Sequence, residues 1–447
     1  MTKLSLKKKT SDSHIRLMLL AKALLTGSAA GLVVSLFRLL IERSLTIWQY
    51  IYRIAAVHLS LLWLIIPASA GIGLVIGLLI RHEPNAMGSG IPQVEGQLAG
   101  ELETAWQRIL PRKFIGGVLG IGAGLFLGRE GPSIQLGSAV GQGIAEHSGT
   151  ERTQRRILIA GGAAAGLSAA FNAPIAGTLF VLEEIYHNFS PLIWMSALTA
   201  AIASDFISSD VFGLQPVLHM HVAGSLPLIL YWHLLAVGLI LGLLGYFYQR
   251  TLLVMPLLYS KIPRISRAFH GIIPLLLVIP VGLFCPQLLG GGNALIIHLS
   301  HASPGLLLLI GIFALRFVFS MICYGSGLPG GIFLPILSLG ATIGAIYGAA
   351  MSALGLLPAT YETNLIIVAM AGYFAGISKA PFTAIILITE MVGSLEHLLP
   401  LAIVSLVAYL VVDALGGAPI YQSLLEQSTI GSKLNVLSGK MIDSSAK

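Results

Sequence analysis

Residues 165–184 read AGLSAAFNAPIAGTLFVLEE, and residues 375–391 read AGISKAPFTAIILITEM. Both stretches contain Ala-Gly, then Leu or Ile, then Ser, followed by Ala-Pro and an apolar run. In each of them a glutamate stands nine residues after the proline, Glu183 in the first stretch and Glu390 in the second. The two stretches are about 200 residues apart, which indicates an internal repeat that divides most of the chain into two related halves.

A second, weaker repeat supports this division. GREG at residues 128–131 is echoed by GLPG at residues 327–330, at nearly the same separation. Together the repeats predict halves over approximately residues 15–210 and 226–425. Two related halves with broken helices are typical of secondary transporters, but the pattern does not tell whether one half is inverted relative to the other.

The composition is that of a membrane protein. Of the 447 residues, 55% are hydrophobic and only 10% are charged, whereas a soluble domain has about 25% charged residues. The length allows roughly ten or more membrane segments of about 20 residues each. The net charge of +7 comes largely from Lys and Arg in short loops beside apolar runs, which favours the positive-inside pattern over nucleic-acid binding. Cys285 and Cys323 lie in or beside apolar runs, so we expect no disulfide framework.

The long apolar runs predict the helices that cross the membrane. They lie near residues 15–41, 58–80, 190–209, 226–249, 269–289, 303–324 and 397–416. Shorter runs, bounded by glycine, proline or charge, predict broken helices that meet near the middle of the membrane. These lie at residues 114–127, 131–144, 173–185 and 380–393.

The two ends of the chain are expected to be short cytoplasmic tails. Basic residues in 1–14 precede the first apolar run, which is too long for a signal peptide. Residues 426–447 are too few for an appended soluble regulatory domain. We therefore expect residues 1–447 to form a single membrane domain.

Glycine-rich turns precede several apolar helical segments. They are GSGIP at 88–92, GREGP at 128–132, GSGLPGGIFLP at 325–335 and GGAPIY at 416–421. A helix N-terminus presents unpaired N–H groups and a partial positive charge, so several of them aimed at one point predict an anion site. One such turn alone would indicate only a tight turn or helix packing, which is our interpretation of GGVLGIGAG at 116–124.

Four glutamates stand in or at the end of apolar segments: Glu130, Glu183, Glu184 and Glu390. A charge within a bilayer costs about 2.5–3.5 kcal/mol, which makes each a functional candidate, although each could instead cap a helix or lie at the membrane interface. A buried carboxyl beside an anion site can take up a proton or compete with the anion, and would thereby couple two ions. No spacing typical of a metal site, a nucleophilic serine or a nucleotide-binding loop occurs, so the sequence does not indicate an enzyme.

Taken together, these motifs resemble the CLC family of chloride channels and chloride/proton exchangers over about residues 85–425. GSGIP, GREGP, GGIFLP and a late tyrosine occur in the order and approximate spacing typical of the family. The resemblance implies an all-α polytopic membrane protein of two inverted halves with broken and re-entrant helices. It also implies a homodimer with one pathway in each subunit.

The resemblance assigns a role to each candidate residue. The Ser89 hydroxyl, the Tyr421 phenol and the backbone N–H groups of Ile332 and Phe333 would bind a central chloride. Glu130 would be the gating glutamate of the outer anion site, which its carboxylate can occupy until it is protonated.

Two further acids correspond to the proton route of the family. Glu184 resembles the internal proton-transfer glutamate, and Glu183 would line the same route. Because channels of the family usually carry an apolar residue in place of Glu184, this acid favours exchange over passive conduction. Ser89 favours chloride over nitrate or fluoride. The absence of the paired regulatory modules of eukaryotic members favours the cytoplasmic (inner) membrane of a prokaryote, with both termini cytoplasmic.

The leading hypothesis is therefore a chloride/proton antiporter that needs no cofactor and binds chloride as its substrate. A passive voltage- or pH-gated chloride channel of the same fold is the first alternative. A membrane scaffold or intramembrane enzyme that uses the buried acids is the alternative of another class, and it predicts no ion flux in liposomes.

Overall fold

The computed structural model describes residues 3–220, 224–263, 265–302 and 304–428, and over these ranges the chain is helical with no β-strand. This confirms the all-α prediction. The helices are α1 (Lys3–Val57), α2 (Leu62–His82), α3 (Ile91–Ala99), α4 (Trp106–Gly122), α5 (Glu130–His147), α6 (Arg152–Phe171), α7 (Pro174–Phe180), α8 (Pro191–Phe212), α9 (Trp232–Ser260), α10 (Ile272–Phe284), α11 (Asn293–His301), α12 (Leu306–Gly325), α13 (Phe333–Ala353), α14 (Glu362–Ser378), α15 (Pro381–Val392) and α16 (Leu398–Ala414). A π-helical turn at Val181–Ile185 extends α7, and residues 420–428 are also helical.

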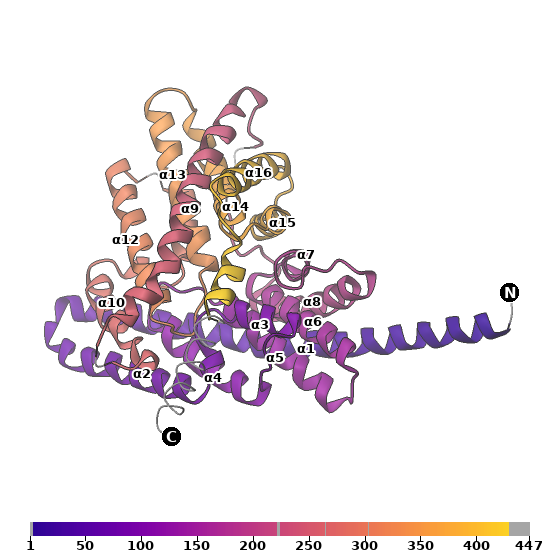
Figure 1. The fold of residues 1–447 in the computed structure, drawn as a ribbon. Helices are drawn as coiled ribbons and strands as arrows, with labels where there is room; N and C mark the ends of the chain where they lie inside the picture. Colours follow the sequence, from indigo (N-terminus) through magenta and orange to yellow (C-terminus); the bar gives the residue numbers. More distant parts are fainter. Residues whose placement is uncertain (1–2, 221–223, 264, 303, 429–447) are drawn as a thin grey trace, which may run out of the picture.

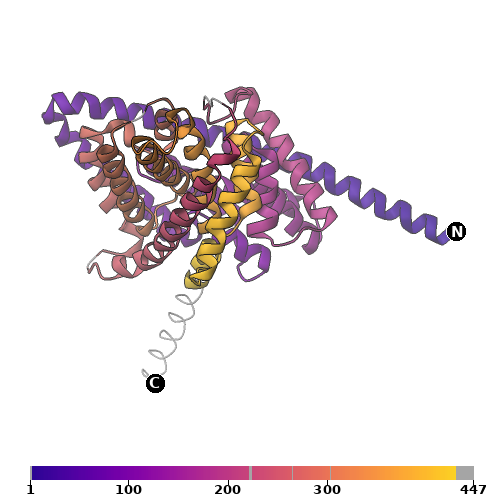
Figure 2. The same cartoon turned by 90° about the horizontal axis from the view of Figure 1, so that it is seen from above.

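The helices form two groups that follow the order of the chain. Figure 1 shows α1–α8 in the lower part of the molecule and α9 with α12–α16 standing above them, while α10 lies beside α2. The break between α8 and α9 falls between the two predicted halves. The N-terminal part of α1 projects away from both groups (Figure 2). The predicted N-terminal tail is thus helical from Lys3, and residues 429–447 of the predicted C-terminal tail lie outside the described residues.

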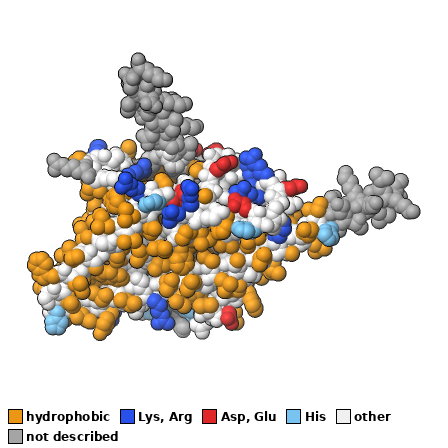
Figure 3. Space-filling model, turned by 90° about the horizontal axis from the view of Figure 1, so that it is seen from below, with side chains coloured by type: hydrophobic (Ala, Val, Ile, Leu, Met, Phe, Trp, Pro, Cys, Tyr) orange, Lys and Arg blue, Asp and Glu red, His pale blue; other side chains and the backbone are white. Residues whose placement is uncertain are grey.

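Seven described helical segments are long and apolar enough to cross a membrane. Six of them correspond to predicted runs; the seventh, Phe333–Ala353, was not predicted as a span and is 83% buried inside the protein. The run near 397–416 forms α16, which is shorter than the other spans. Seven spans are fewer than the ten or more membrane segments expected from the length of the chain, because several other helices are short or rich in small and polar residues. Hydrophobic side chains cover a broad face of the molecule, with charged ones gathered along its edge (Figure 3).

The central helices of the first half pack backbone against backbone. A Cβ atom at Gly137 of α5 would lie 2.0 Å from the carbonyl oxygen of Gly162 on α6, and one at Gly162 would lie 2.1 Å from that of Gly137. Only glycine fits at either position. Without a hydrophobic driving force between helices in lipid, such close approach through small residues is a main source of packing energy.

The repeated glutamates cap helices of the opposite half. The Glu390 carboxylate, at the end of α15, accepts hydrogen bonds from the N–H groups of Ile175 (3.1 Å) and Ala176 (2.7 Å) at the start of α7. Reciprocally, the Glu183 carboxylate accepts from the N–H groups of Phe382 (3.1 Å) and Thr383 (2.7 Å) at the start of α15. The glutamate stands nine residues after the proline in both repeats. This shared spacing places the carboxylate of one half on the unpaired amides of the other half.

We expect Glu390→Ala to lower the free energy of unfolding by about 1 kcal/mol, because it leaves two amides at the start of α7 without their charged acceptor. The midpoint of thermal unfolding of the purified protein in detergent measures this loss. Glu396→Ala, which truncates an exposed glutamate six residues further on, is the matched control. Equal midpoints for the two variants would contradict the capping role.

Candidate anion site and buried carboxylates

Three of the predicted glycine-rich turns are joined by backbone hydrogen bonds. Gly128 and Gly331 exchange a pair of N–H···O=C bonds of 2.7 Å each, immediately before α5 and α13 begin. Gly88 donates to Gly327 (3.1 Å) and accepts from Gly330 (3.0 Å), which ties the turn before α3 to the turn before α13. The two turns of the weaker sequence repeat thus lie side by side, and the structure pairs Gly128 with Gly331 rather than with Gly327. The starts of α3, α5 and α13 are brought together at one place.

Ser89 and Tyr421 are both buried side chains with hydroxyl groups. The Ser89 Oγ accepts a hydrogen bond from the N–H of Ile91 (3.2 Å) at the start of α3. The Tyr421 ring packs edge-on against Phe180 with 6.0 Å between centroids, and its hydroxyl has no hydrogen-bond partner among the described residues. A buried hydroxyl without a partner is costly, so a ligand that accepts a hydrogen bond from this hydroxyl would stabilise the site.

The start of α13 supplies the backbone donors. Ile332 and Phe333 are buried, and N–H groups at a helix start have no acceptor within their own helix. The Phe333 ring is held by Phe374 (4.4 Å between centroids), Phe171 (5.3 Å) and Phe180 (5.6 Å). This aromatic cluster fixes the direction in which the first turn of α13 points.

Glu130 is fully buried at the first position of α5. Its carboxylate faces the amides of Glu130 itself and of Leu334, at the first turns of α5 and α13, and within the described part of the chain neither carboxylate oxygen completes a hydrogen bond. The electrostatic neighbours of the Tyr421 phenol include both Glu130 and Glu184. A carboxyl group thus lies where two helix starts favour an anion.

Glu184 lies in the π-helical turn that follows α7 and is 3% exposed. The nearest acids are Glu95 on α3 and Glu183. Glu184 Oε1 and Glu95 Oε2 are buried and have no hydrogen-bond partner among the residues described. Glu183 differs, because its carboxylate is held by the amides at the start of α15 and by the Thr383 hydroxyl (2.7 Å).

The sequence analysis missed two buried charges near these groups. The first is Glu95, which could have been identified from the sequence because it is a charge within an otherwise largely apolar nine-residue helix. The other is Lys113 on α4, which is fully buried. Its Nζ donates to the carbonyls of Gly88 (2.7 Å), Ala86 (3.1 Å) and Met87 (3.4 Å), the residues directly before Ser89. Lys113 therefore both orients this turn and places a positive charge behind it.

No cluster of three or more His, Cys, Asp or Glu side chains that could hold a metal ion occurs in the part of the chain that the structure describes. The glycine run at 116–124 packs helices, as predicted: Gly116 lies against Pro329, and Gly117 against Phe37.

Comparison with known proteins gives a consistent result. A family model described as voltage gated chloride channel matches residues 72–413, which include every candidate site residue except Tyr421. The H(+)/Cl(-) exchange transporter ClcA of Vibrio campbellii is 34% identical over 430 residues, covering 92% of this chain and 90% of that protein. The protein of the same name from Klebsiella pneumoniae is 35% identical over 432 residues, covering 92% and 89%.

Solved structures agree. A slow cyanobacterial Cl-/H+ antiporter superposes with a TM-score of 0.87 at 32% identity, covering 92% of this chain and 97% of the other. A CLC-type fluoride/proton antiporter, at 23% identity and a TM-score of 0.72, shares the fold. The family model, the sequence identity over most of the chain and the shared helical architecture agree. The chain therefore belongs to the voltage gated chloride channel family.

Proposed function

We propose that this protein is a secondary active transporter that exchanges chloride for protons across the membrane. The observation that carries the proposal is the pair of buried glutamates, Glu130 and Glu184, that both act electrostatically on the buried phenol of Tyr421. Buried acids of this kind mark proton pathways in membrane proteins. The names of the relatives and of the cyanobacterial structure support the same activity.

Chloride binds among four donors: the hydroxyls of Ser89 and Tyr421 and the N–H groups of Ile332 and Phe333. None of these donors is an ion, so an anion is desolvated without forming a permanent salt bridge. The Lys113 ammonium, held behind the Ser89 turn, adds a longer-range attraction. Chloride is the substrate, and the mechanism needs no cofactor.

Glu130 gates the outer anion position. When ionised, its carboxylate competes with chloride for the helix starts of α5 and α13. Protonation removes that competition and allows chloride to enter, so chloride movement is linked to proton uptake. This is how a single side chain links the two ions.

Glu184 passes protons between Glu130 and the cytoplasmic side. Glu183 lines this route, with its carboxylate engaged in the cap of α15, and Glu95 is the neighbouring acid. We place the protein in the inner membrane of a prokaryote as a homodimer, with N- and C-termini in the cytoplasm. Its activity is transport rather than catalysis.

The first test of the exchange activity uses Glu184→Gln, which keeps the shape of the side chain but cannot carry a proton. Purified protein in liposomes receives a chloride gradient with no initial pH difference, and chloride efflux and external pH are recorded together. We expect wild type to move protons opposite to chloride. Glu184→Gln is expected to retain chloride flux and to lose proton movement by about tenfold or more, a change of at least about 1.4 kcal/mol in the barrier to proton transfer.

Glu396→Gln, which neutralises an exposed glutamate, serves as the control and is expected to behave as wild type. Chloride flux without pH change in the wild-type protein would establish the channel alternative. Normal proton movement in Glu184→Gln would refute the relay.

Glu130→Ala is expected to abolish the coupling of chloride and proton movement at the outer anion position. With no carboxylate to compete for the outer position, chloride flux should persist at all pH values and proton movement should stop. Initial rates of chloride efflux over a pH series measure the first effect, and the proton signal measures the second. Chloride transport that still accelerates on acidification in this variant would rule out Glu130 as the gate.

Lys113→Met is expected to weaken chloride binding about tenfold, or about 1.4 kcal/mol, because it removes a buried charge and frees three carbonyls that fix the Ser89 turn. Isothermal titration calorimetry with chloride measures the affinity. Lys261→Met, at an exposed lysine after α9, is the control. Unchanged affinity in a folded Lys113→Met protein would show that the ammonium plays no part in the site.

A further inference from the structure

We infer that Glu42 of α1 is a positioning residue that sets how readily Glu130 exchanges its proton, by holding two arginines beside it. The inference rests on the proposed gating role of Glu130. It arises from a cluster of charges that the sequence analysis did not identify: Arg38 and Glu42 on α1, and Arg129 directly before Glu130. We refer to these three residues as the arginine clamp.

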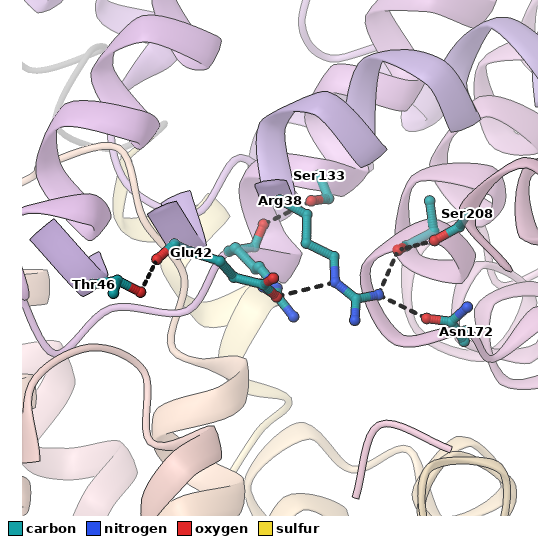
Figure 4. Close-up of polar contacts among 8 residues, drawn as sticks. Arg38, Glu42, Thr46, Ser133, Asn172 and Ser208 are labelled. Atoms are coloured by element: carbon teal, nitrogen blue, oxygen red, sulfur yellow. Dashed lines mark hydrogen bonds and ion pairs between the residues drawn. The ribbon is translucent and has the colours of Figure 1, made fainter. Parts of the chain in front are cut away.

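One carboxylate oxygen holds the clamp together. Glu42 Oε1 lies 3.2 Å from Arg38 Nε, as Figure 4 shows. The same oxygen lies 2.5 Å from Arg129 Nη1. Arg129 is the residue that precedes α5, so its backbone is continuous with that of Glu130. Among the described residues, the guanidinium of Arg129 donates to Glu42, and its Nε is buried without a hydrogen-bond partner. Glu42 therefore determines where the charge of Arg129 lies.

Arg38 anchors the clamp to the rest of the protein. Its Nη1 donates to Asn172 Oδ1 (2.7 Å) and to the carbonyl of Ala169 (3.4 Å), as Figure 4 shows. Its guanidinium carbon lies 3.9 Å from the centre of the Phe212 ring. Because Arg38 is fixed by α6 and α8, the Glu42 carboxylate that bonds to it is fixed as well.

The clamp has a buried side and an open side. The side chains of Arg38 and Arg129 are 9% and 8% exposed, whereas that of Glu42 is 45% exposed. Glu42 lines an open cavity of about 300 Å³ together with Leu39, Arg43, Thr46, Val211 and Phe212. The negative charge of Glu42 thus faces the cavity, whereas both arginine side chains are buried.

Several charged or titratable groups enter the balance around Glu130. Arg129 and Arg38 act on it directly, and the Tyr421 phenol is also among its neighbours. From α8, Asp205 acts on Arg38, and Arg43 faces the same cavity as Glu42.

Neutralising Glu42 would leave the buried arginines with one less negative charge beside them. The ionised form of Glu130 would then be more stable, and a higher proton concentration would be needed to displace its carboxylate. Acid activation of exchange would therefore move to lower pH.

The test is Glu42→Gln, which keeps a hydrogen-bond acceptor for both arginines but removes the charge. Exchange rates in liposomes are measured over roughly pH 4–8 with equal pH on both sides. We expect the midpoint of acid activation to move down by about one pH unit, a tenfold change in proton concentration, with an unchanged chloride-to-proton ratio. Glu42→Asp, which retains the charge, should lie closer to wild type than Glu42→Gln.

Glu146→Gln is the matched control, because Glu146 pairs with Arg155 (2.6 Å) near the far end of α5. Arg43→Gln removes a positive charge from an exposed side chain of the same cavity, and should therefore move the midpoint to higher pH. This variant tests the inference even if Glu42→Gln fails to fold.

An unmoved midpoint in folded Glu42→Gln, or an equal shift in Glu146→Gln, would overturn the inference. A wild-type protein that moves chloride without protons would instead refute exchange. In that case the pH midpoints of chloride flux in wild type, Glu42→Gln and Glu146→Gln would decide the role of Glu42.

Discussion

A helix that starts inside a protein exposes N–H groups with no acceptor in their own chain segment, and much of this structure depends on how those groups are satisfied. The starts of α7 and α15 are satisfied permanently, each by a glutamate from the opposite half. The starts of α5 and α13 instead lie near Glu130, whose carboxylate completes no hydrogen bond among the described residues. A carboxylate at a helix start thus stabilises α7 and α15, and in the proposed mechanism the same chemistry serves as a displaceable group at α5 and α13.

The difference between the two uses lies in the number of donors. Glu183 accepts three hydrogen bonds, from two amides and the Thr383 hydroxyl, so removing it would leave all three groups unpaired. Glu130 faces two amides but completes no hydrogen bond with them among the described residues, so it would lose less if it moved or took up a proton. The Gly128–Gly331 pair sets the starts of α5 and α13 side by side, as the reciprocal caps do for α7 and α15.

The sequence predicts those parts of the structure that depend on local pattern. Glycine-rich turns before apolar runs identified the helix starts, and the spacing from proline to glutamate identified the repeat that becomes the reciprocal cap. The arginine clamp could not be predicted, because its contacts join residues 87 and 134 positions apart without any shared motif. Lys113 was missed because a lone lysine next to apolar residues does not reveal that three carbonyls 25–27 residues earlier converge on it. The span Phe333–Ala353 was missed because it directly follows a turn read as part of the anion site.

The buried cations differ in what neutralises them, and this difference bears on how an anion is attracted. Lys113 is held by three carbonyls, and Arg316 by the carbonyls of Leu288, Gly290 and Gly291 with the Ser338 hydroxyl. Carbonyls satisfy the N–H groups but carry no full charge, so the positive field of these two residues persists at longer range. Arg38 and Arg129 have a carboxylate between them and therefore contribute less to that field. Attraction by distant cations, combined with neutral donors at the point of contact, would bind an anion at the proposed site without trapping it, as the proposed exchange requires.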